Sequence, residues 1–184
     1  MPWIFGYGSL LWRPDFDFEE SAAARLDGWE RRLLQGSPDH RGVPDDPGRV
    51  VTLLRSSGSA VWGRAFRISP QLATDIVAKL DRREQAGYEL LHLPLTLAGG
   101  RRTEGWVYVA GPENPSFLGS ASLESMLEQI ERCAGASGTN RDYVLSLDEA
   151  LASMGQVDDE VRRVASALRR MGADPEEALS YSCP

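Results

Sequence analysis

The sequence is poor in the residues that build metal centres and disulfide frameworks. It has only two cysteines, Cys133 and Cys183, and two histidines, His40 and His92, among 184 residues. Two cysteines are too few for a disulfide framework, and neither histidine lies at helical spacing from another plausible ligand. The sequence therefore predicts neither a set of disulfides nor a zinc site.

Basic clusters, long apolar runs and internal repeats are also missing from the sequence. No stretch is long enough to span a membrane, and no cationic segment followed by an apolar run marks a secretory signal. The formal net charge of −7 argues against a large nucleic-acid-binding surface. With 42% hydrophobic and 26% charged residues, the chain is expected to fold as one soluble, cytoplasmic domain over residues 1–184.

The first 110 residues have the character of a sheet. Apolar or aromatic-rich runs predict strands over residues 3–7, 49–55, 61–68 and 102–110. Ser69 is a credible N-cap, and apolar residues at spacings of three and four predict a helix from Pro70 to about Arg83. We expect the strands to belong to one closed or strongly curved sheet.

After residue 119 the pattern becomes helical. Ser122 is placed to cap a helix whose apolar face includes Leu123 and Cys133. Ser146 and Glu149 have capping-box spacing, which predicts the start of a second helix. A last helix is predicted to carry residues 157–168 and to end near Gly172. Strands followed by helices indicate the α+β class, with a small curved sheet or partial β-barrel and surrounding helices.

A glycine-containing junction follows the first predicted strand, where residues 6–11 read Gly-Tyr-Gly-Ser-Leu-Leu. Leu11 stands where a dinucleotide-binding fingerprint requires its third glycine, and Ser9 is not in the Gly-x-Ser-x-Gly motif of a hydrolase. A tight turn here can still surround a carboxylate or an oxyanion with backbone N–H groups, and Gly8 permits close approach. The alternative is an ordinary glycine turn that closes the strand.

Glu84 interrupts the apolar face of the helix predicted from residue 70. Leu72, Ile76 and Leu80 define that face, and one further step of four residues reaches Glu84. Burial raises the pKa of a carboxyl group, which suits a general base and acid that works near neutral pH. Alternatively, the helix ends before residue 84, and Glu84 is solvated or paired with a neighbouring arginine.

The segment from Gly36 to Gly48 is a long loop that contains three prolines and three glycines. A long ordered loop beside a sheet is often functional. Its Arg41, and Arg49 just after it, are of the type that binds a substrate carboxylate in bidentate fashion. The alternative is that both arginines are simply solvated.

Together these segments resemble the ChaC family, the glutathione-specific γ-glutamylcyclotransferases. The resemblance rests on segments that occur in the family's order: residues 5–10 and 12–16, Gln35-Gly36-Ser37, Asp39-His40-Arg41-Gly42, residues 47–53, Leu80-Asp81, Arg83-Glu84, Gly87-Tyr88, Ser137-Gly138, Asn140 and Tyr143. The Asp-His-Arg-Gly and Pro-Gly-Arg-Val-Val-Thr-Leu segments are typical of the glutathione-specific branch. Gln85-Ala86, where the family often has Lys-Gly, and Pro38 depart from its pattern without removing a reacting group.

This resemblance implies cleavage of glutathione, a small-molecule substrate, to 5-oxoproline and cysteinylglycine, with no metal or cofactor. It also implies the family's mixed fold and the roles of the site residues. Glu84 performs both proton transfers, and the backbone of Tyr7, Gly8, Ser9 and Leu10 holds the γ-glutamyl group.

The resemblance is less definite about the rest of the substrate. It makes Tyr143, together with Arg41 or Arg49, the candidates for orienting one end of it. Other γ-glutamyl compounds as substrates, and a non-catalytic regulatory protein, are alternatives that a resemblance of fold alone leaves open. The sequence does not predict the oligomeric state.

Overall fold

The structure of the chain is a computed structural model that describes residues 1–83 and 87–172. Glu84 and Cys183 therefore lie outside the described residues. The central element is a closed barrel of five strands in the order β1-β3-β2-β4-β5. The strands are β1 (Trp3–Gly6), β2 (Glu20–Ser37), β3 (Gly48–Arg67), β4 (Glu89–Leu97) and β5 (Arg102–Val109).

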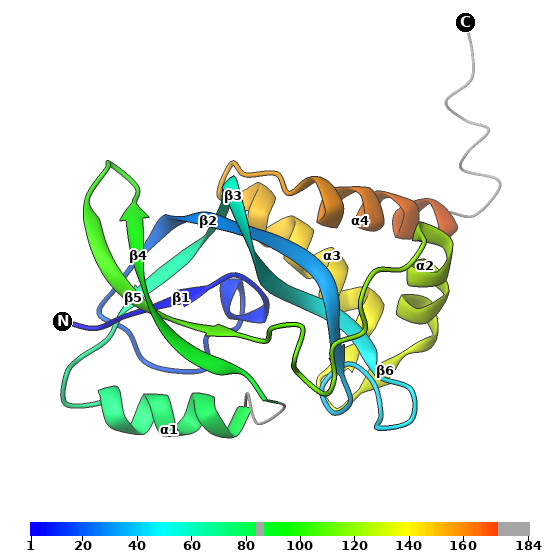
Figure 1. Cartoon of the computed structure of the whole chain (residues 1–184), viewed down its shortest axis with the longest axis horizontal. Coiled ribbons are helices and arrows are strands. Elements are labelled where there is room, and N and C mark those ends of the chain that lie inside the picture. Colours follow the sequence, from blue (N-terminus) through cyan, green and yellow to red (C-terminus); the bar gives the residue numbers. More distant parts are fainter. Residues whose placement is uncertain (84–86, 173–184) are drawn as a thin grey trace, which may run out of the picture.

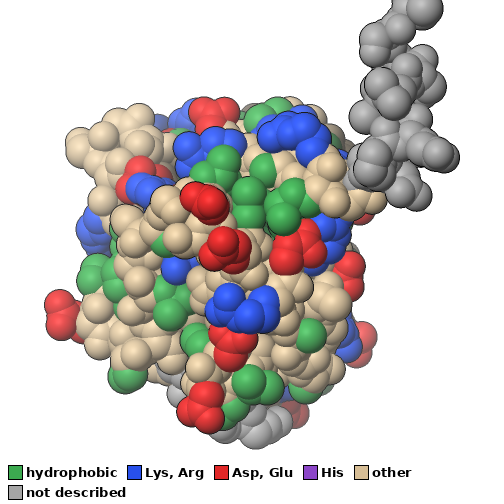
Figure 2. All heavy atoms as spheres, turned by 90° about the vertical axis from the view of Figure 1, so that its right-hand side faces the viewer, with side chains coloured by type: hydrophobic (Ala, Val, Ile, Leu, Met, Phe, Trp, Pro, Cys, Tyr) green, Lys and Arg blue, Asp and Glu red, His purple; other side chains and the backbone are tan. Residues whose placement is uncertain are grey.

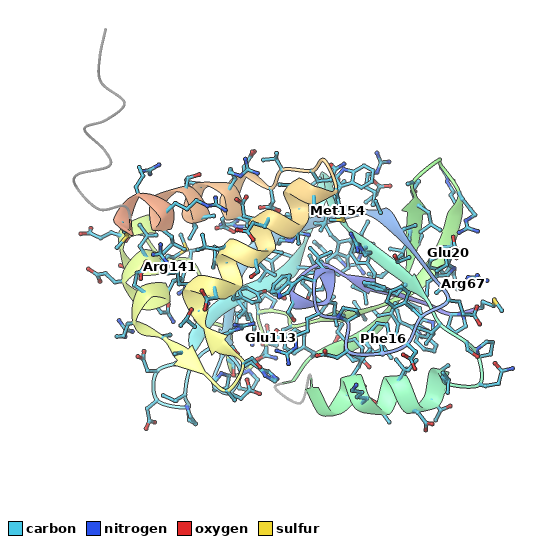
Figure 3. The ribbon with its side chains drawn as sticks, turned by 180° about the vertical axis from the view of Figure 1, so that it is seen from behind. Phe16, Glu20, Arg67, Glu113, Arg141 and Met154 are labelled. Carbon is cyan, nitrogen blue, oxygen red and sulfur yellow. The ribbon has the colours of Figure 1, made fainter. Side chains whose placement is uncertain are left out.

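The barrel closes through the short first strand. β1 pairs with β3 in antiparallel fashion and with β5 in parallel fashion, the second contact placing Ile4 beside Trp106. The first residue of β2, Glu20, pairs with the last residue of β3, Arg67. Their side chains form an ion pair with an N–O distance of 3.0 Å (Figure 3). Closure removes the exposed edges that an open sheet would leave. It confirms the curved sheet expected from the sequence.

Two strands, β2 and β4, were not predicted from the sequence. β2 carries charged residues at its exposed positions, which weakens its apolar signal, although its buried positions alternate over the first half. β3 is one strand of 20 residues rather than two, because the polar segment between residues 55 and 61 continues the strand through an irregularity opposite Gly28. The twist of such long paired strands curves the sheet into a barrel.

The helices lie on two sides of the barrel. α1 (Ala73–Arg83) lies on one side, and α2 (Leu123–Arg132), α3 (Asn140–Ser153) and α4 (Asp159–Met171) cover other faces (Figure 1). A small hairpin, β6 (Ala134–Gly135) and β7 (Gly138–Thr139), joins α2 to α3. One apolar cluster fills the barrel and extends to the faces of α2, α3 and α4, while a smaller cluster lies under α1.

The capping residues in the structure show which of the predicted helix boundaries are correct. Ser122 caps α2 as predicted, its hydroxyl accepting the N–H of Ser125, and α4 ends at Met171 with Gly172 as its C-cap. The predicted start at Ser146 is wrong, because Thr139 caps α3 seven residues earlier by accepting the N–H of Asp142. α1 begins at Ala73 rather than Pro70, since residues 70–72 form a turn.

The surface mixes charges of both signs. On the face that contains α2 and the end of α4, acidic, basic and apolar side chains alternate without a large single-sign patch (Figure 2). Within residues 1–83 and 87–172, no helix is long and apolar enough to cross a membrane.

Candidate functional site

A cavity of about 230 Å³ opens beside the end of β1. Its walls come from segments that are far apart in the sequence: the turn after β1, the loop after β2, the start of β3, and the first turn of α3. The side chains and backbone that line it include Phe5, Tyr7, Gly8, Ser9, Leu10, Arg13, Asp15, Ser37, Asp39, His40, Arg41, Val51, Tyr88, Tyr108, Ser137 and Tyr143.

The turn after β1 is held by packing around its glycines. A Cβ on Gly6 would lie 2.7 Å from the Cβ of Leu10, so only glycine fits where the chain turns into the short 3₁₀ helix Ser9–Leu11. A Cβ on Gly8 would lie 3.2 Å from the Tyr143 hydroxyl and 3.3 Å from a Val51 methyl. Gly8 has φ −120° and ψ −132°, so what it provides is space rather than left-handed backbone.

Two tyrosines from different elements meet at this turn. Tyr7 is buried and its hydroxyl donates to the carbonyl of Tyr108 on β5, at 2.8 Å. Tyr143 is also buried, and its hydroxyl oxygen accepts the N–H of Val51 at 3.2 Å. The early start of α3 places Tyr143 within one turn of the helix N-terminus and so beside Gly8.

Arg41 lies at the other side of the cavity in a braced loop. Its backbone N–H donates to the Ser37 hydroxyl at 3.1 Å, and its guanidinium donates to the carbonyl of Thr139 at 3.2 Å. The guanidinium lies 5.5 Å from the centre of the Tyr143 ring, within the range of a cation–π interaction. Arg41 is 7% exposed, so its charge is largely shielded from water while it lines the cavity.

Two polar residues of the same wall, His40 and Ser137, were not among the predicted site residues. The imidazole Nδ1 of His40 lies 2.9 Å from the Ser137 hydroxyl. The hairpin β6–β7 brings Ser137 here, because the backbone N–H groups of Ala136 and Ser137 donate to the carbonyls of Asp39 and His40. The position of His40 next to Arg41 could have indicated a place at the site. No local pattern predicts its contact with Ser137, which is 97 residues away in the sequence.

Arg49 was expected at the site, but the structure places it outside the cavity. Its guanidinium donates to the carbonyls of Leu33 and Gly119 at 2.8 and 2.9 Å, and to the Gln129 side chain at 2.9 Å. Burial lowers the pKa of this guanidinium. These contacts join the barrel to α2, which is a structural role.

Glu84 lies outside the described residues, which resume at Gly87. Ile76 and Leu80 form the buried face of α1 as predicted, while Leu72 precedes the helix and is 41% exposed. Beyond the gap, Tyr88 lines the cavity. Tyr108 also lines it, and its hydroxyl donates to the Asp81 carboxylate of α1 at 2.7 Å.

The arrangement suits recognition of a small polar molecule. The cavity combines a backbone turn, tyrosine hydroxyls and a shielded guanidinium. Within the part of the chain that the structure describes, no three His, Cys, Asp or Glu side chains come together in a group that could hold a metal ion. Fold and cavity together define an α+β barrel with a cavity suited to a small polar molecule.

Comparison with known proteins assigns this barrel to a family. The profile of the family described as ChaC-like protein matches residues 2–171, and the chain belongs to that family. This confirms the resemblance seen in the sequence.

The relatives have consistent names. The chain is 38% identical over 183 residues to γ-glutamylcyclotransferase 2-3 of Arabidopsis thaliana, covering 95% of this chain and 92% of the relative. It is 40% identical over 164 residues to glutathione-specific γ-glutamylcyclotransferase 1 of Homo sapiens, covering 86% and 73%. A crystal structure of a γ-glutamylcyclotransferase specific to glutathione from yeast superimposes with a TM-score of 0.85 at 26% identity, covering 92% and 96%.

Proposed function

We propose that this protein is a γ-glutamylcyclotransferase that cleaves glutathione to 5-oxoproline and cysteinylglycine. The observation that carries the proposal is the cavity between the turn at residues 7–10, Tyr143 and Arg41. It occurs in a chain that aligns over nearly its full length with relatives named for this activity. The family's match over residues 2–171 includes every segment of the cavity wall.

The reaction is an intramolecular acyl transfer. The α-amine of the γ-glutamyl group attacks its own γ-amide carbonyl, the C–N bond to cysteinylglycine breaks, and a five-membered lactam closes. The attacking amine must lose a proton, and the leaving amine must gain one. The substrate supplies its own nucleophile, so the protein must fold the substrate, stabilise an oxyanion and move a proton.

The proton transfers are assigned to Glu84. In this proposal its carboxylate takes a proton from the substrate ammonium and returns it to the departing amine. The support is indirect: Ile76 and Leu80 are buried on one face of α1, and a further step of four residues along the sequence reaches residue 84. Two residues that follow the gap in the chain, Tyr88 and Tyr108, line the cavity, and Tyr108 also bonds to Asp81 of α1. One residue that performs both transfers suits this cyclisation, because the nitrogen that joins and the nitrogen that leaves are bonded to the same γ-carbonyl carbon.

Backbone N–H groups of the turn at residues 7–10 are assigned to the γ-glutamyl group. Arg41 is assigned to a substrate carboxylate, because it is the buried guanidinium of the cavity wall. His40 and Ser137 extend the same polar wall and provide further hydrogen bonds to that end of the substrate. Arg49 is left out of the assignment because its donors serve the barrel and α2.

The direct test is release of 5-oxoproline by the purified protein. Glutathione and γ-glutamyl-alanine are supplied separately at equal concentrations, and we expect rapid release from glutathione only. Comparable release from both would indicate a general γ-glutamyl cyclotransferase. Binding of glutathione without turnover would instead favour a regulatory protein and contradict the proposal.

A further inference from the structure

A buried arginine lies directly behind the site turn and has no part in the assignments above. Arg31 is on β2, and its side chain is 1% exposed. Its Nε donates to the carbonyl of Tyr7 at 2.9 Å, one Nη to the carbonyl of Trp62 at 2.6 Å, and the other Nη to the Asp158 carboxylate at 2.9 Å. A single guanidinium thus joins the site turn, β3 and Asp158, the N-cap residue of α4.

The hydrogen bond from Arg31 to the Tyr7 carbonyl also orients the N–H of Gly8. The carbonyl of Tyr7 and the N–H of Gly8 belong to one planar trans peptide unit, so they point in opposite directions. Holding the carbonyl against Arg31 therefore directs the Gly8 N–H to the opposite side. Gly8 lines the cavity, whereas Arg31 is on β2 and bonds to Asp158, the N-cap residue of α4.

The charge of Arg31 adds an electronic effect. A guanidinium bonded to the carbonyl oxygen polarises the amide and makes the N–H on its other side a stronger donor. The surroundings favour this effect, because the guanidinium is 1% exposed and water screens its charge little. Burial lowers the pKa of Arg31, while Asp158 opposes that shift.

We propose that Arg31 is a positioning residue of the cyclotransferase, which aims and polarises the Gly8 N–H so that it stabilises the oxyanion formed on the γ-carbonyl. Arg31 does not touch the substrate. It acts through the Tyr7–Gly8 peptide, and Asp158 anchors it to α4. The inference rests on the proposed function and assigns a catalytic purpose to the C-terminal helix, for which the sequence analysis proposed no function.

The chain offers a matched control in the adjacent residue. Arg32 also joins β2 to α4, with its Nε donating to Glu160 at 3.1 Å, but its side chain is 36% exposed and it makes no bond to the site turn. Arg32→Gln therefore loosens the same helix without releasing Tyr7. Arg31→Lys keeps the positive charge but cannot reach three acceptors as the planar guanidinium does.

The test compares kcat and KM of Arg31→Lys and Arg32→Gln with the parent enzyme, using glutathione. Loss of an oxyanion donor costs about 100-fold to 1,000-fold in kcat, so a misdirected donor should cost at least about tenfold, with KM changed less than about threefold. Arg32→Gln should keep kcat within about twofold of the parent. The amide resonance of Gly8 in a ¹H–¹⁵N spectrum should shift upfield only in Arg31→Lys.

Two results would overturn the inference. One is a folded Arg31→Lys protein with parental kcat; the other is an equal loss of kcat in both variants at equal loss of thermal stability. If Arg31→Lys does not fold, Arg31→Gln, which keeps a single amide donor, carries the same prediction. Absence of 5-oxoproline release from the parent would refute the proposed function instead, and the Gly8 resonance would still report on the peptide.

Discussion

At the scale of single residues, the site depends on a glycine that provides space. A side chain on Gly8 would meet the Tyr143 hydroxyl and Val51 at 3.2 and 3.3 Å. Gly8→Val should therefore abolish glutathione binding measured by calorimetry, because its branched side chain fills the cavity next to the turn. Gly111→Val is the control, since a Cβ there meets no atom within 4 Å. Unchanged affinity in Gly8→Val would mean that the turn does not contact the substrate.

Substitutions of Arg41 and Arg49, the two arginines suggested by the sequence, should have different effects on substrate binding and on stability. Arg41→Gln should raise KM for glutathione by about tenfold or more, as expected when a charged partner of a carboxylate is lost. Arg49→Gln should lower Tm but leave KM unchanged, because its guanidinium bonds to Leu33, Gly119 and Gln129. Steady-state kinetics and thermal unfolding of both variants test this. A higher KM in Arg49→Gln would restore that residue to the site.

The sequence predicted the residue types of the site better than their positions. The turn at residues 7–10, Arg41 and Tyr143 come together at the cavity, whereas Arg49 does not. An arginine at the start of a strand gives no sign of which side of the sheet its side chain will occupy. No site role was predicted for His40 and Ser137, because their contact depends on the hairpin β6–β7.

At the scale of elements, sequence signals succeeded where a helix carries a side-chain cap. Ser122 marks the start of α2, and Gly172 marks the end of α4. Ser146 was misleading, because the capping-box spacing recurs inside α3, where the backbone donors already bond within the helix. β2 was missed because its many charged residues interrupt the apolar pattern, and the strand forms through pairing within the barrel rather than from local preference.

The cap of α4 should be a major source of stability. The Asp158 carboxylate accepts the N–H of Val161 and also pairs with buried Arg31. Asp158→Asn keeps a good N-cap but leaves the guanidinium without its counter-charge, which costs about 2–4 kcal/mol and should lower Tm by roughly 5–15 °C. Asp159→Asn, an exposed neighbour, is the control for thermal unfolding. Equal Tm values for the two variants would show that the ion pair contributes little.

An ion pair between Asp46 and Arg132 ties the loop that carries Arg41 to α2. Both oxygens of Asp46 accept from the Arg132 guanidinium, at 2.7 and 2.8 Å. The hydrogen bond with Arg132 lowers the pKa of Asp46 below its usual value of 3.8. A carboxyl whose pKa is lower when folded stabilises the protein above its unfolded pKa and loses that effect as the pH falls through the folded pKa.

Acid titration of stability tests this anchor. Asp46→Asn should lower Tm relative to the parent at pH 7, and the difference should shrink as the pH falls below about 3.8. Asp45→Asn, in the same loop but exposed, serves as the control. A Tm difference that is independent of pH would show that the Asp46 charge is not what holds the loop.

At the scale of the whole molecule, barrel closure brings distant segments to one cavity. The short β1 pairs with both β3 and β5. The turn that follows β1, residues 7–10, therefore lies where β3, β5 and α3 meet at the cavity. Local sequence preferences predicted a curved sheet but not its strand order, because the order depends on pairings between distant residues. The ChaC-like family match over residues 2–171 covers all of these elements.

The central claim is that the protein cleaves glutathione by intramolecular cyclisation, with Glu84 carrying the proton. The most direct measurement is the rate of 5-oxoproline release from glutathione by Glu84→Gln, compared with the parent and with Glu89→Gln, an exposed glutamate at the start of β4. We predict that Glu84→Gln folds with a Tm at or above that of the parent and loses about two to four orders of magnitude in turnover, while Glu89→Gln keeps parental turnover. Parental turnover in a folded Glu84→Gln protein would contradict the account.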